Sequence, residues 1–73
     1  MTDYLTFASN TLAFRAEQAL LASGMAVQVV PRPPGIVGRC ALALRLPPGS
    51  LGAAKEALAA RRIPILKIHA VPA

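Results

Sequence analysis

The segment GMAVQVVPRPPGIVGRCALALRLPPG, residues 24–49, decides the fold. In its second half, residues 40–46 (CALALRL) place leucines at alternate positions, which is the period of a strand with one buried face. In its first half, residues 26–30 (AVQVV) alternate in a similar way. The PRPPG sequence at residues 31–35 is predicted to be a loop, because its prolines cannot donate ladder hydrogen bonds. Two strands joined by a proline-rich loop therefore lie at the centre of the chain.

On either side of this centre the sequence predicts one helix and one further strand. Ser9 or Asn10 can cap the first helix, and Gly24 can close it. Pro64 ends the second helix. The predicted elements are, in chain order, a strand over residues 4–7, a helix over 11–23, strands over 26–30 and 40–46, a helix over 50–62 and a strand over 65–70.

This order, βαββαβ, predicts the α+β class and a ferredoxin-like sandwich, in which two helices cover one face of an antiparallel sheet. Right-handed crossovers place the first and third strands in the middle and the last strand at an edge beside the first. Leu66 and Ile68 are then expected to face the helices. The other face is left open and is expected to carry small and polar groups, namely Thr6, Gln28, Ala41, Ala43, Arg45, Lys67 and His69.

Length and charge limit the function. A chain of 73 residues predicts one domain over residues 1–73, without a large active-site cleft. The net charge of +5 suggests an anionic partner, but the basic residues are spread over every element. No apolar run is long enough to span a bilayer, and the acidic start of the chain at Asp3 is unlike a secretory signal. We therefore predict a cytoplasmic protein in which the single cysteine stays a thiol.

Cys40 is the strongest candidate for chemistry. Arg39 and Arg32 could stabilise a thiolate, a persulfide or a selenide anion, because nearby cations lower the pKa of a thiol. Gly35 and Gly38 would allow backbone N–H groups to turn toward the sulfur. The prolines would stiffen the loop and so hold the thiol outside the core. The alternative is that Cys40 is a small buried apolar residue, since it shares strand parity with Leu42. The residues alone leave both interpretations open.

Other site chemistries find little support. One cysteine, one histidine and three acids do not make a closed metal site, and we expect neither a metal nor another cofactor. His69 is the only base available for nucleophilic catalysis and is expected at a solvated sheet edge away from Cys40. Three aromatic residues, Tyr4, Phe7 and Phe14, are few for stacking bases, which disfavours nucleic-acid binding. We expect Arg61 and Arg62 to be charges at a helix end, and Glu17 to be a surface or ion-pair residue.

Four blocks of the sequence resemble the selenium/sulfur carrier-like family of small bacterial proteins. The blocks are Phe7-Ala8-Ser9; Ala13-Phe14-Arg15-Ala16-Glu17 with Leu20-Leu21 and Gly24; Pro31-Arg32-Pro33; and Cys40-Ala41-Leu42-Ala43-Leu44-Arg45. The resemblance covers nearly the whole chain. One departure is Ala41, because the family commonly has glycine after the cysteine.

The resemblance implies a carrier that is not an enzyme. Cys40 would hold sulfur or selenium as a persulfide or selenopersulfide, with Pro31 and Pro33 shaping its loop. The implied partners are the proteins that donate and accept the atom. The competing hypothesis is an interaction or dimerisation module, in which the open sheet face forms a homodimer and Cys40 is structural.

Overall fold

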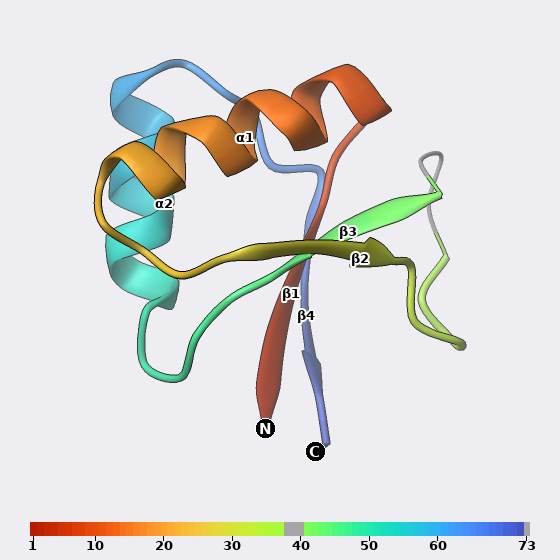
Figure 1. The fold of residues 1–73 in the computed structure, drawn as a ribbon. Coiled ribbons are helices and arrows are strands. Elements are labelled where there is room, and N and C mark those ends of the chain that lie inside the picture. The colour runs from red at the N-terminus through yellow and green to blue at the C-terminus, as the bar shows by residue number, and fades with distance from the viewer. Residues whose placement is uncertain (38–40, 73) are drawn as a thin grey trace.

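Four strands form one antiparallel sheet with the order β2-β3-β1-β4 in the computed structural model of the chain (Figure 1). The structure describes residues 1–37 and 41–72. The elements are β1 (Thr2–Thr6), α1 (Asn10–Ala22), β2 (Gln28–Pro31), β3 (Leu42–Arg45), α2 (Leu51–Ala60) and β4 (Lys67–Val71). The predicted α+β, ferredoxin-like βαββαβ arrangement is confirmed, with β1 and β3 central and β4 at the edge beside β1.

Both helices lie on one side of the sheet (Figure 1). Alanines form the inner face of α1, and this lets the helix approach the strands closely. Leu5 of β1 lies opposite Leu44 of β3, and both are fully buried beneath the helices. The core consists of Leu5, Phe7, Ala13, Ala16, Ala19, Leu20, Val27, Leu44, Leu46, Ala54, Leu58 and Ile63.

The two helices end with the same hydrogen-bond pattern. After α1, Gly24 has φ +84°, its N–H donates to the Leu21 carbonyl at 3.0 Å, and the Met25 N–H donates to that of Leu20 at 3.0 Å. After α2, Arg62 takes the place of the glycine with φ +56°. A residue with a side chain pays for this left-handed conformation, whereas glycine does not.

This hydrogen-bond pattern at the end of α2 fixes the position of Ile63. The Arg62 N–H donates to the Ala59 carbonyl at 3.1 Å, and the Ile63 N–H reaches back to the Leu58 carbonyl at 3.0 Å. Ile63 is thereby turned into the core, where it is 6% exposed. The helix was predicted to continue to Arg62, but it ends at Ala60 because the chain reverses at the left-handed residue.

One other sequence prediction was wrong, and a second held for the face of the strand but not for its burial. Pro31 was placed in the loop, yet it is the last residue of β2 and pairs with Leu42. A proline is tolerated there because β2 is an edge strand, where a missing N–H need not break the ladder. Ile68 faces the helix side, as expected, because it pairs with buried Leu5 of β1. Leu66 and Ile68 are nevertheless 48% and 40% exposed. α1 packs on β2 and β3 and against α2, so the edge strand β4 extends past the cover of the helices.

Because the helices bury Leu44 but not Leu66, truncating these two leucines is predicted to lower the free energy of unfolding by different amounts. Leu44→Ala should lower the free energy of unfolding by about 2 to 5 kcal/mol, because it leaves a cavity under α1. Leu66→Ala removes the same atoms from a half-exposed site and should cost about 1 kcal/mol or less. Urea unfolding followed by circular dichroism measures both. Equal losses would contradict the assignment of Leu66 outside the core.

Replacing Arg62 by glycine should stabilise the protein. Relief of the left-handed conformation is worth about 1 kcal/mol, and the greater freedom of glycine in the unfolded chain offsets about half of it. The expected gain raises the melting temperature by about 2 to 4 °C in a domain of this size. Arg61→Gly is the matched control, since Arg61 has φ −102° and therefore no left-handed strain that glycine could relieve. A melting temperature that rises in both variants, or in neither, contradicts the strain at Arg62.

Candidate functional site

The connection between β2 and β3 is the segment that the sequence marks for chemistry. Its two described ends are held together, because the Arg32 N–H donates to the Ala41 carbonyl at 2.8 Å. Arg32 is half-buried and Ala41 is exposed. The backbone of Arg32 is therefore fixed beside the residue that follows Cys40 in the sequence.

The first half of this loop contains a tight turn. The Ile36 N–H donates to the Pro33 carbonyl at 3.2 Å across Pro34 and Gly35, and Gly35 has φ +88°. A positive φ at the third residue of a turn requires glycine or a residue that tolerates it. Ile36 is buried but lies outside the core cluster between sheet and helices, while Val37 beside it is 85% exposed. The turn and Ile36 thus give the loop a fixed shape up to Ile36.

The central candidates Gly38, Arg39 and Cys40 lie outside the described residues. The acceptor role of Cys40, the anion-stabilising roles of Arg39 and Arg32, and the loop-shaping roles of Pro31, Pro33 and Gly38 stay predictions. The strand expected to begin at Cys40 begins at Leu42, and Ala41 precedes it.

The sheet face away from the core carries the small and polar residues predicted for it, together with Val30, although Thr6 and Ala43 are buried there rather than open to solvent. One row across all four strands consists of Gln28, Arg45, Tyr4 and His69, and the next includes Ala43, Thr6 and Lys67. The Arg45 guanidinium donates to the Gln28 side-chain carbonyl. Thr6 is almost fully buried, and its hydroxyl lies 3.4 Å from His69 Nε2.

His69 lies on the edge strand, as expected, but it is half-buried rather than fully solvated. β1 separates its strand from β3. The ring is held against Thr6, so it belongs to the surface of the open face.

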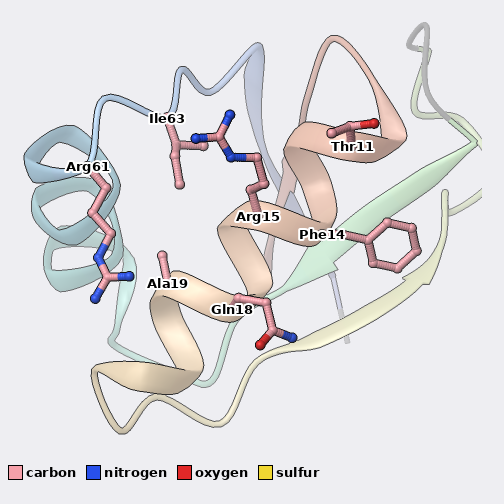
Figure 2. A pocket seen from close by; sticks show the side chains of 7 residues that line it. All are labelled: Thr11, Phe14, Arg15, Gln18, Ala19, Arg61 and Ile63. Atoms are coloured by element: carbon pink, nitrogen blue, oxygen red, sulfur yellow. The ribbon is translucent and has the colours of Figure 1, made fainter.

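A groove that the sequence did not predict lies on the helix side. We call it the helix groove; it consists of two hollows that share Ile63. The first, of about 500 Å³, is lined by Thr11, Phe14, Arg15, Gln18, Ala19, Arg61 and Ile63 (Figure 2). The second, of about 450 Å³, is lined by Lys55, Leu58, Ala59, Arg62, Ile63, Pro64 and Ile65.

The sequence concealed this groove because its basic residues come from separate elements. Arg15 is on α1, whereas Arg61 and Arg62 follow α2 and were expected to be helix-end charges only. Spacing along the chain carries no sign that they meet. The one available indication was Phe14, an aromatic residue beside the inner stripe of α1, which is 49% exposed.

Within residues 1–37 and 41–72, no group of three or more histidine, cysteine, aspartate or glutamate side chains could hold a metal ion. None of the helices in the same part of the chain has the length and apolar character needed to cross a membrane.

Comparison with known families assigns the chain. A family model described as "Putative Se/S carrier protein-like" matches residues 3–70. The chain belongs to this family. The match includes both helices, all of β1 except Thr2, and the β2–β3 connection with Cys40. No curated protein and no solved structure matches the chain.

Membership confirms the resemblance that the four sequence blocks indicated. A carrier-like family implies protein partners in general, because a carried atom must come from one molecule and pass to another.

Proposed function

We propose that this protein is a sulfur or selenium carrier and not an enzyme, and that the thiol of Cys40 holds the carried atom. Family membership over residues 3–70 is the observation that carries the proposal. Cys40 is the only cysteine of the chain, so within this protein only one thiol can form a persulfide.

The proposed transfer needs no oxidant or reductant. The Cys40 thiolate attacks the terminal sulfur of a persulfide on the donor protein, and a bond forms between the two sulfurs. The donor's own sulfur–sulfur bond breaks, and its cysteine leaves as a thiolate with the electron pair. An acceptor thiolate then attacks the terminal sulfur on Cys40 and releases the Cys40 thiolate. The same steps apply to a selenium atom.

The loop geometry supports this role. The backbone of Arg32 is held next to Ala41, the residue that follows Cys40 in the sequence, by a hydrogen bond of 2.8 Å. Arg39 directly precedes Cys40 in sequence. Positive charge favours the thiolate, which is the form of cysteine that attacks sulfur.

Ala41 is compatible with the loop even though the family commonly has glycine there. Among the described residues Arg62 is the only non-glycine residue with a positive φ, so Ala41 adopts an ordinary backbone conformation. The alanine side chain is exposed. The substitution therefore introduces no left-handed strain.

Loading of the thiol is the direct test. Incubating the protein with a cysteine desulfurase and free cysteine should add one sulfur atom, which intact mass spectrometry detects and a reductant removes. Cys40→Ala should take up none. The proposal is wrong if wild-type protein stays unmodified while another persulfide carrier becomes loaded in the same tube.

The module alternative makes an opposite prediction for the native thiol. A structural Cys40 would stay unlabelled by a small alkylating reagent until the protein is denatured, and Cys40→Ala would destabilise the fold. A carrier thiol reacts in the native protein, and its removal leaves the unfolding midpoint nearly unchanged.

The two loop arginines should lower the pKa of the thiol. We expect Arg39→Gln, and to a smaller extent Arg32→Gln, to raise the pKa of Cys40 toward the unperturbed value of about 8.5, because each removes a positive charge that favours the thiolate. The pH dependence of the alkylation rate measures this. Arg15→Gln removes an equal charge from α1 and should leave the profile in place; an equal shift in all three variants would assign the effect to net charge.

A further inference from the structure

The helix groove has the composition of a protein docking surface. Its floor is apolar, with buried Ala19, Leu58 and Ile63. Phe14 stands at one end of the first hollow, and Arg61 stands at the other (Figure 2). Exposed aromatic and arginine side chains around an apolar floor are typical of residues that dominate protein interfaces.

The residues that follow α2 lie between the two hollows of this groove and contribute one cation to each. Ile63 is held on the end of the helix by its hydrogen bond to Leu58, and it belongs to both hollows. Arg61 lines the first hollow, and Arg62, in its left-handed conformation, lines the second. Arg62 thus places a cation at the groove in a backbone conformation that glycine would adopt at lower energy.

The charge of the groove has one sign. Arg15 and Arg61 line the first hollow, and Lys55 and Arg62 line the second. No aspartate or glutamate is among the lining residues of either hollow. Such a surface attracts an acidic partner and orients it during encounter.

We propose that the helix groove binds an acidic amphipathic helix of a partner protein. Two apolar side chains on one face of that helix fill the hollows on either side of Ile63, and its carboxylates meet the four cations. Helix-in-groove recognition uses apolar anchors that lie along one face of the bound helix. The inference concerns the helix side of the molecule and does not depend on what Cys40 carries.

Two other occupants fit less well. A second copy of this chain carries a net charge of +5 and only three acidic residues, so like charges would meet at the groove. A nucleic acid would satisfy the cations through its phosphates but would leave the apolar floor at Leu58 and Ile63 without a matching group.

The groove also has a useful position relative to the β2–β3 connection. β1 is antiparallel to β3, so the end of β1 lies beside the beginning of β3, and α1 starts a few residues after β1. Thr11 and Phe14 of the groove are on the first turns of α1. A partner docked along the groove therefore reaches the end of the sheet where β3 begins.

Binding of designed peptides to the full chain tests the proposal. The probe is a fluorescent synthetic helix with leucines along one face and glutamates elsewhere. The controls are a scrambled peptide of the same composition and a single-stranded RNA. Fluorescence anisotropy should show the amphipathic peptide binding at least about tenfold more tightly than either control. Absence of binding, or tighter binding of the RNA, overturns the proposal.

Charge reversal locates the binding surface. Arg15→Glu with Arg61→Glu should weaken binding of the peptide by about tenfold or more. Arg45→Glu with Lys67→Glu makes the same change in net charge on the open sheet face and should alter it by less than about threefold. Equal loss in both double variants would show non-specific attraction and overturn the proposal. So would sedimentation showing a dimer that only the groove variant abolishes.

Arg62→Gly separates binding from folding. This variant should melt at a higher temperature than the wild type and still bind the peptide more weakly, since it removes strain and a groove cation together. Weaker binding with raised stability supports the docking role. Unchanged affinity would show that Arg62 does not contribute to the docking surface and would contradict binding across both hollows.

Discussion

The pairing of β1 with strands on both of its sides is the constraint on which the rest of this structure depends. Its residues pair with β3 on one side and β4 on the other, so Leu5 lies between Leu44 and Ile68. The Leu5–Leu44 pair is fully buried beneath the helices. This central position sets the direction of β3 and therefore the end of the sheet at which the β2–β3 connection emerges.

The alanine face of α1 determines how far the helices cover the sheet. Ala13, Ala16 and Ala19 bring α1 close to β2 and β3, where a larger residue would hold it away. With only two short helices, the cover does not extend over β4, and Leu66 and Ile68 remain half-exposed. The same closeness leaves room beside α1 for the groove that Arg61 and Ile63 complete.

Two features of this small domain bear on how a partner could recognise it. The β2–β3 connection is shaped by the turn from Pro33 to Ile36, and the helix groove begins at the first turns of α1. Under the proposed carrier function, the partners would recognise the protein through its outer surface. The two proposals fit together, because the loop would present the reactive atom while the separate groove would hold the partner.

The sequence by itself determined the order of elements, the central place of β1 and β3, and the small and polar residues of the open face. These follow from local periodicity, from proline and glycine, and from the handedness of crossovers. It also singled out Cys40, since no other residue combines its chemistry with such a loop. The tertiary structure decided which apolar positions are covered, as Leu66 and Ile68 show, because burial depends on how far neighbouring elements extend. It alone brought Arg15, Arg61 and Arg62 together, since charges on different elements acquire a common surface only when those elements pack.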